Sequence, residues 1–169
     1  MAKVEILYGL EVYSHECFED DRGQLFTLWE QNEIPDLVFN HDKVAISKAK
    51  VLRGLHTDKS WKLITCLSGS IQLVVVNYEK QSEQYLDWCD FILHSSNKHK
   101  KSILIPPGYL NGHLILTEQA VFHYKWSYSG EYPDVKDQIS VNWSDPKVGI
   151  NWLINNPILS ERDRNTPLL

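Results

Sequence analysis

Residues 63–76 read LITCLSGSIQLVVV, two short apolar runs on either side of a Ser-Gly-Ser turn. The first run is Leu63–Leu67 and the second is Ile71–Val76, and each has the length of a single β-strand. A glycine-containing turn between two such runs is typical of a β-hairpin. We therefore predict that these residues form two strands that pair with each other.

Similar short runs, each bounded by turn residues, recur along the rest of the chain. The predicted strands are Lys43–Ser47, Tyr85–Leu93, Ser102–Ile105, Gly112–Leu116 and Ala120–Ser127. Six Trp, eight Tyr and five Phe also favour half-buried pleated surfaces. Helical periodicity is weak, and the best short candidates are Thr27–Gln31 and the turn at Asp145–Val148. Many short strands with few helices indicate an antiparallel sandwich or barrel.

The length and composition are those of one globular unit. The chain has 169 residues, of which 43% are hydrophobic and 23% charged, so it can bury a core. It contains no internal repeat, low-complexity tract or linker-like stretch, and we expect residues 1–169 to form a single domain. The net charge of -5 disfavours a nucleic-acid binder. A phosphorylated small ligand remains compatible, because a few arginines suffice to hold one pyrophosphate.

Cysteine usage and hydropathy bear on the compartment. The three cysteines, Cys17, Cys66 and Cys89, are odd in number and lack paired spacing, which argues against a disulfide framework and a zinc ribbon. No stretch approaches the roughly 20 apolar residues of a membrane span, and the first residues have no signal-peptide pattern. We expect a cytoplasmic protein without a membrane partner.

Titratable residues concentrate in five short segments beside the predicted strands. In chain order these are FEDDRG at 18–23, VLRGLH at 51–56 with Lys62 shortly after, IPPGYLNGH at 105–113, AVFHYK at 120–125 and LSERD at 159–163. With NWSDP at 142–146 and INW at 150–152, this ordered set resembles the dTDP-4-dehydrorhamnose 3,5-epimerase family from Phe18 to Leu169. The resemblance implies an all-β cupin jelly-roll sandwich with short flanking helices. It also implies a homodimer with exchanged N-terminal strands and no metal or organic cofactor.

The implied chemistry accounts for the catalytic residues of the set. A ketone at C4 of a sugar acidifies the hydrogens on C3 and C5, so epimerisation needs a base, an acid on the opposite face and a group that stabilises the enolate. By resemblance, His56 is the base and Asp163 the carboxylate that orients it. Tyr124 is the acid. Lys62 lies near the ketone, where one well-placed donor is typically worth roughly 3 kcal/mol of barrier.

Other residues of the set are expected to bind the substrate. Arg22 and Arg53 match positions that hold the pyrophosphate, where a guanidinium grips two oxygens. Phe26, Lys43 and Asn111 complete the predicted binding residues. The aromatic residues Trp126, Tyr128 and Tyr132 either belong to the core or interface or supply a surface on which the base stacks.

The sequence departs from the family pattern in four places around these residues. Thr27 stands where Glu is usual, and His41-Asp42-Lys43 stands where Gln-Asp-Asn is usual. Thr57-Asp58 replaces Tyr-Gln, and Leu110–His113 replaces Ala-His-Gly-Phe. The segments His41–Lys43, Trp61–Cys66 and Tyr128–Tyr132 resemble a branch that acts on GDP-linked 4-keto-6-deoxy-heptoses in capsule synthesis. The nucleotide (GDP, dTDP or CDP), the sugar (hexose or heptose) and the number of inverted centres stay open.

The remaining histidines and basic residues are predicted to be structural. Side chains alternate along a strand, so His123 points away from Tyr124. His113 stands at an apolar position of the family and is expected to pack. We expect His94 and the basic run 98–101 to form a solvated turn. No His-X-His motif occurs, which argues against a metallo-cupin site.

Two other functions compete with an epimerase. A cupin 3,4-ketoisomerase of the same nucleotide sugars would share the fold and a similar base, but would move the ketone. The Asp163 segment and the Tyr124-Lys125 register favour epimerisation. A nucleotide-sugar binding protein without catalysis is the second alternative. Retention of a base, its carboxylate partner and an acid argues against it.

Overall fold

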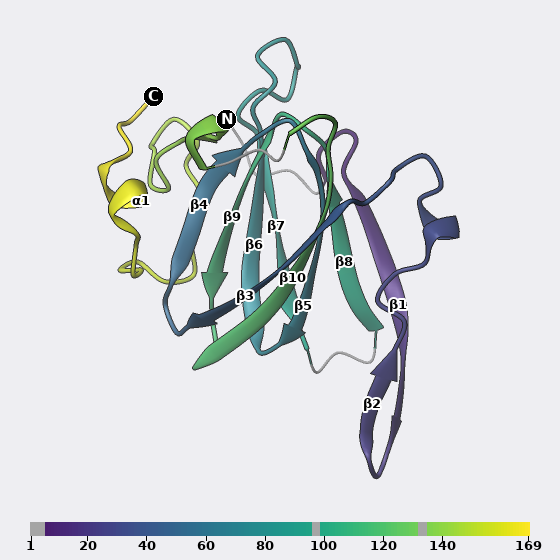
Figure 1. Ribbon diagram of the computed structural model, residues 1–169. Coiled ribbons are helices and arrows are strands. Elements are labelled where there is room, and N and C mark those ends of the chain that lie inside the picture. Colours follow the sequence, from purple (N-terminus) through teal and green to yellow (C-terminus); the bar gives the residue numbers. More distant parts are fainter. Residues whose placement is uncertain (1–5, 96–98, 132–134) are drawn as a thin grey trace.

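The computed structural model describes residues 6–95, 99–131 and 135–169, and within them the chain forms two antiparallel sheets packed face to face (Figure 1). The first sheet has the order β2-β1-β8-β5-β10-β3, with strands β1 (Glu11–Asp20), β2 (Gly23–Phe26), β3 (His41–Lys48), β5 (Trp61–Ser68), β8 (His99–Ile105) and β10 (Gln119–Ser127). The second has the order β11-β4-β9-β6-β7, with strands β4 (Leu52–Thr57), β6 (Ser70–Asn77), β7 (Trp88–His94), β9 (Tyr109–Ile115) and β11 (Ile139–Ser140). Short helices flank them: η1 (Gln31–Glu33), η2 (Val135–Asp137) and α1 (Glu161–Asn165). The predicted all-β sandwich is confirmed.

The predicted pairing of the two central strands is wrong, although both strands exist. β5 pairs with β8 and β10 in one sheet, whereas β6 pairs with β7 and β9 in the other. Gly69 carries the chain across between the sheets with φ +77, and a Cβ there would clash with the Gln119 carbonyl. A tight turn with glycine therefore marks a change of sheet here instead of a hairpin.

Both faces of the five-stranded sheet are buried. On β6, Ile71, Leu73 and Val75 point into the core between the sheets. The alternate residues Val74 and Val76 belong to a second cluster on the outer face, with residues of the C-terminal segment such as Trp152. This outer cluster holds the C-terminal segment against the sandwich and so delivers α1 to the edge of β4 (Figure 1).

Several local expectations are corrected by the structure. Of the predicted helix Thr27–Gln31, residues 27–30 are not helical, and only Gln31 belongs to a helical turn, as the first residue of η1. In the basic run, Lys100 lies on β8 and is 2% exposed, with its ammonium donating to Gln24 Oε1 at 3.2 Å, so it is not part of a solvated turn. Lys98 lies outside the described residues, and His94 is the exposed last residue of β7. The turn at Asp145–Val148 exists, closed by a hydrogen bond from the Val148 N–H to the Asp145 carbonyl.

The β1–β2 hairpin projects beyond the sandwich, at the side away from α1 (Figure 1). The part of β1 that pairs with β8 ends at Glu16, and the strand then continues with β2 alone as its partner. Phe18 and Leu25 on this hairpin are 64% and 74% exposed. Two large apolar side chains therefore face solvent on an arm that little else of the chain covers.

Candidate active site

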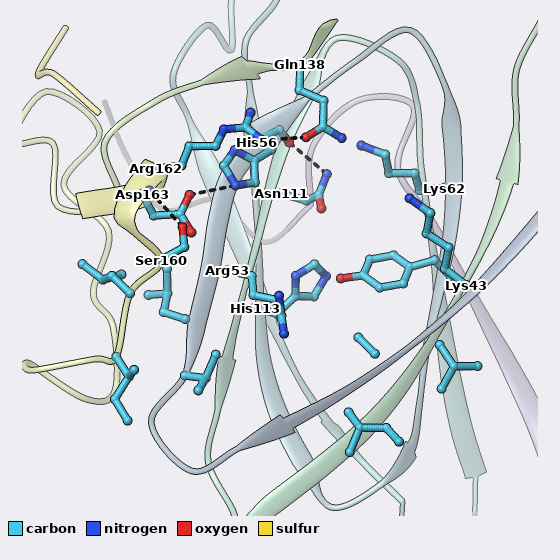
Figure 2. A pocket seen from close by; sticks show the side chains of 18 of the residues that line it. Lys43, Arg53, His56, Lys62, Asn111, His113, Gln138, Ser160, Arg162 and Asp163 are labelled. Carbon is cyan, nitrogen blue, oxygen red and sulfur yellow. Dashed lines mark hydrogen bonds and ion pairs between the residues drawn. The ribbon is translucent and has the colours of Figure 1, made fainter. Parts of the chain in front are cut away.

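A cavity of about 820 Å³ lies between the two sheets at the α1 side of the sandwich (Figure 2). Strands β3, β5 and β10 form one wall, strands β4 and β9 form the facing wall, and α1 with the residues before it closes the side. The cavity is lined by most of the predicted site residues: His56, Lys62, Tyr124, Asp163, Lys43, Arg53 and Asn111. The topology thus gathers segments that lie far apart in the sequence.

Strand alternation and one irregularity explain which side chains face the cavity. Asn111 and His113 are two residues apart on β9, so both point inward. Arg53 and His56 are three apart on β4, yet both line the cavity because the β4–β9 register shifts between them. Gly54 occupies this irregularity with φ +127, and a Cβ there would lie 2.7 Å from the Asn111 carbonyl oxygen.

His56 and Asp163 form the central pair of the site. The Nε2 atom of His56 lies 2.8 Å from Oδ1 of Asp163, whose side chain is 4% exposed (Figure 2). Asp163 sits in the first turn of α1, where the Ser160 hydroxyl caps the helix by accepting from the Asp163 N–H at 3.1 Å. Burial alone would raise the pKa of Asp163, but His56, Ser160 and the Gly54 N–H together lower it. The carboxylate is thus kept anionic beside the imidazole.

The other ring nitrogen of His56 meets Ser140, which sequence reasoning missed. Nδ1 lies 3.0 Å from Ser140 Oγ. Arg162 donates to that same oxygen from Nε at 3.0 Å and from Nη2 at 2.6 Å. A serine oxygen has two lone pairs and one proton, so with both lone pairs engaged its proton points to Nδ1. Nδ1 is then the acceptor, and Nε2 carries the proton that faces Asp163.

The same arginine links the pair to a buried lysine through Gln138. Arg162 Nη1 donates to Gln138 Oε1 at 3.1 Å, and Gln138 Nε2 donates to Asp58 Oδ2 at 3.3 Å. Asp58 in turn pairs with Lys62 Nζ at 2.9 Å. Burial lowers the pKa of Lys62, and the Asp58 carboxylate opposes that effect. Burial would raise the pKa of Asp58, but Lys62 and Ser60 lower it.

Tyr124 comes from the opposite wall to His56. It lies on β10, with its ring centroid 5.3 Å from that of His113 in an edge-on arrangement. Burial raises the pKa of Tyr124, against a lowering effect of Arg53, so the phenol holds its proton in the free site. Arg53 donates to Ser47 Oγ at 3.1 Å. Lys43 lies over the Trp126 ring, 4.5 Å from its centroid.

Two predicted binding residues lie outside the cavity of their own chain. Arg22 is at the tip of the β1–β2 hairpin, where its 90% exposed side chain pairs with Asp20 at 2.5 Å. Phe26 ends β2, with the Lys100 ammonium 4.9 Å from its ring centroid. Neither lines the cavity that holds His56.

The remaining histidines and aromatic residues also divide between the cavity and its surroundings. His123 turns away from the cavity, and its Nε2 lies 2.9 Å from Asp42 Oδ1, in agreement with a structural role. His113, expected only to pack, does stack on Phe122 at 4.9 Å but also lines the cavity. Trp126 lines the cavity too, whereas Tyr132 lies outside the described residues.

The described part of the chain brings no group of three or more His, Cys, Asp or Glu side chains together in a way that could hold a metal ion. None of its helices is long and apolar enough to cross a membrane.

Residues 5–169 match the family model described as dTDP-4-dehydrorhamnose 3,5-epimerase. An enzyme of that name from Salmonella typhimurium is 33% identical over 162 residues, covering 90% of this chain and 86% of the relative. A dTDP-6-deoxy-D-glucose-3,5-epimerase from Legionella pneumophila, solved with dTDP-4-keto-L-rhamnose, superposes with a TM-score of 0.88 at 26% identity, covering 99% of this chain and 90% of that one. ChmJ, a 3'-monoepimerase from Streptomyces bikiniensis solved with dTDP-quinovose, superposes with a TM-score of 0.86 at 26% identity, covering 99% of this chain and 87% of that one.

Proposed function

Because this chain belongs to the dTDP-4-dehydrorhamnose 3,5-epimerase family of isomerases, we propose that its cavity binds a nucleotide-linked 4-keto-6-deoxy sugar and inverts C3, C5 or both. The observation that carries the proposal is the arrangement around one cavity. An imidazole backed by a buried carboxylate lies on one wall, and a phenol and a buried lysine lie on the other. Epimerisation through an enolate needs these groups on opposite faces of the sugar ring.

In the first half of the reaction, His56 removes the proton from a carbon next to the ketone. Asp163 holds Nε2, so Nδ1 is the atom that accepts the proton, and its contact with Ser140 gives way to the substrate. The C–H electron pair becomes the new C=C bond, and the carbonyl π pair moves onto oxygen. The Lys62 ammonium stabilises that oxyanion, and Asp163 stabilises the imidazolium.

In the second half, Tyr124 returns a proton to the same carbon from the opposite face. The enolate oxygen re-forms the carbonyl while the C=C pair takes the phenolic proton, which leaves a phenolate. Arg53 lowers the pKa of Tyr124 and therefore stabilises this phenolate. His56 and Tyr124 then recover their starting states by proton exchange with solvent, so each inverted carbon carries a solvent hydrogen.

The identity of the nucleotide and the number of inverted centres form part of the proposal. The similar structures named above carry thymidine-linked sugars, and one of them is a monoepimerase. Thr27 and Lys43 motivate the alternative that this chain takes a GDP-linked heptose in surface polysaccharide synthesis. Calorimetry with dTDP, GDP and CDP tests the choice. A clear preference for dTDP removes the heptose alternative, and a preference for GDP supports it.

Turnover in deuterium oxide tests the reaction itself. We expect dTDP- or GDP-linked 4-keto-6-deoxy sugars to gain deuterium at C3, C5 or both, with the carbonyl still at C4 by NMR. A carbonyl moved to C3 would show a ketoisomerase, and binding without exchange would show a non-catalytic protein. Treatment with a chelator should leave the exchange rate unchanged, since we expect no metal to take part.

Replacement of the base gives the sharpest single prediction. We expect His56→Asn to abolish deuterium exchange, because the amide cannot take up the proton, while nucleotide affinity stays within about twofold of wild type. Exchange is followed by mass spectrometry and affinity by calorimetry. Undiminished exchange in His56→Asn would show that another group is the base.

A further inference from the structure

His113 stands apart from the other buried histidines. Its side chain is 3% exposed, and neither ring nitrogen makes a well-aligned hydrogen bond within the part of the chain that the structure describes. The backbone of Arg53, opposite His113 on β4, lies close enough only to raise the pKa of the ring by a minor amount. By contrast, His15 pairs with Ser102 at 2.7 Å and His123 pairs with Asp42 at 2.9 Å. Buried polar atoms in folded proteins are almost always paired, so two unpaired nitrogens on one ring call for an explanation.

The surroundings of the ring show where a partner would come from. One face of the imidazole stacks on Phe122, with a centroid distance of 4.9 Å and an interplanar angle of 22°. The edge of Tyr124 lies against it, and the ring lines the cavity beside Arg53 (Figure 2). Both ring nitrogens are closed to solvent in the empty protein, and the cavity lies beside the ring, so a bound molecule could supply their partner after a small movement of the side chain.

The charge state of the ring limits what that molecule can be. Burial, with the nearby cations of Lys62 and Arg53, lowers the pKa of His113 to about 3, against a smaller opposing effect of the Arg53 backbone. The ring is therefore neutral at working pH, with one N–H donor and one acceptor nitrogen. A neutral ring in a cationic setting is a poor partner for a phosphate, which charged donors hold better. A hydroxyl, which both donates and accepts, suits it well.

We propose that His113 is a specificity residue that exchanges a hydrogen bond with a hydroxyl group of the sugar. The proposal deepens the function proposed above and rests on it. The sugar is the part of such a substrate that lies beside Tyr124, where the proton transfer takes place, and the imidazole is directly against that ring. A phenylalanine would fill the same space and stack on Phe122, but would leave the hydroxyl unpaired. The histidine thus lowers the stability of the empty protein and favours a hydroxylated sugar.

The test uses His113→Phe in two measurements on the purified full-length chain. In the absence of ligand we expect the Tm to rise by about 2–4 °C, because an unpaired polar ring is replaced by an apolar one. In the His56→Asn background, which prevents turnover, we expect affinity for the nucleotide sugar to fall by about tenfold, as for one lost hydrogen bond. Affinity for the nucleoside diphosphate alone should stay within about twofold, since it lacks the sugar.

His123→Phe is the matched control, since His123 is a buried histidine next to Tyr124 on β10 that is paired and faces away from the cavity. There we expect the opposite pattern, a lower Tm with unchanged affinity for the nucleotide sugar. Equal affinity of His113→Phe and wild type for the nucleotide sugar would overturn the proposal. An equal loss for the diphosphate alone would also overturn it, because the ring would then serve the nucleotide end or the cavity shape.

A measurement on the wild-type histidine keeps the proposal testable if the variant fails to fold. The ¹⁵N shifts of the His113 ring should move when the nucleotide sugar binds to the His56→Asn protein and stay unchanged with the diphosphate alone. Unmoved shifts in both cases would refute the hydrogen bond. Deuterium exchange by the wild type tests the epimerase proposal separately, so failure of one is distinguishable from failure of the other.

Discussion

His56 is fixed on both sides by groups that differ in charge. Asp163 faces Nε2 as an anion, whereas the Ser140 hydroxyl faces Nδ1 as a neutral donor held by Arg162. A carboxylate stabilises the imidazolium that forms when the base takes a proton, and a hydroxyl is easily displaced. In the mechanism proposed above, this asymmetry gives the two nitrogens different tasks: Nε2 anchors the ring and Nδ1 takes up the proton.

Asp163→Asn tests the anchoring task. We expect kcat to fall by about 100- to 10,000-fold with little change in nucleotide affinity, because an amide supports neither the tautomer nor the imidazolium. Steady-state kinetics and calorimetry measure the two effects. A rise in KM with kcat unchanged would instead assign Asp163 to substrate binding.

The same variant can be used to measure how the contribution of Asp163 to folding stability depends on pH. The folded-state pKa of Asp163 lies below its ordinary value of 3.8, so the carboxylate adds stability that is fully present above that value. The stability is lost as the pH falls through the folded-state pKa. The difference in unfolding free energy between wild type and Asp163→Asn should therefore be constant near neutrality and shrink in acid below about pH 4. Urea denaturation at several pH values measures it. A difference that grows in acid would contradict the assignment.

At the residue scale, the sequence reveals the groups that belong to a motif and misses those that only support them. His56, Lys62, Tyr124 and Asp163 lie in recognisable segments, and the structure brings them around one cavity. Ser140 reaches His56 from 84 residues along the chain, through the pairing of β11 with β4, and no local pattern marks it. The position of His113 in the cavity could have been predicted, because residues two positions apart on a strand, such as Asn111 and His113, share a face.

At the scale of strands, the central error concerns pairing and not the strands themselves. β5 and β6 are both buried almost throughout, since the sheets cover each other and outer clusters cover their backs. A continuous apolar run with a short turn has the same appearance whether the chain folds back in one sheet or crosses to the next. The crossing is set by the partners β8, β9 and β10, all of them later in the sequence.

A buried ion pair joins the turn between β4 and β5 to the start of β5. Asp58 and Lys62 are 8% and 4% exposed, and Lys62 Nζ lies 2.9 Å from Asp58 Oδ2. Removing one partner leaves a buried charge, so we expect Asp58→Asn alone to lower the unfolding free energy by about 3–5 kcal/mol. Lys62→Met alone should cost less, because Ser60 and Gln138 also donate to Asp58.

The double variant Asp58→Asn/Lys62→Met should be less destabilised than the sum of the single variants. Urea denaturation of all four proteins gives the coupling energy, which we expect to exceed about 1 kcal/mol. Additive losses of unfolding free energy would show that the two charges do not interact. Loss of activity in the double variant is expected in either case, since we propose that Lys62 stabilises the enolate.

At the scale of the whole molecule, the position of the β1–β2 hairpin does not explain its predicted role if the chain acts alone. Arg22 is predicted to hold pyrophosphate, yet it lies exposed outside its own cavity, at the tip of the hairpin that carries the apolar side chains of Phe18 and Leu25. A homodimer with exchanged N-terminal strands, as the family resemblance implies, would cover the apolar side chains and bring Arg22 to a second cavity. We therefore expect a dimer by light scattering, each of whose sites takes Arg22 from the other chain.

Mixing two defective chains tests this arrangement. Arg22→Ala should raise KM by about tenfold or more through loss of a charged phosphate contact, and His56→Asn should abolish turnover. In a heterodimer purified through two different tags, the cavity of the Arg22→Ala chain keeps His56 and receives Arg22 from its partner. Such a dimer should show the wild-type KM at about half the wild-type kcat, because one of its two sites is intact. If each hairpin served its own chain, the heterodimer would keep the high KM of Arg22→Ala, since no site would then combine both residues.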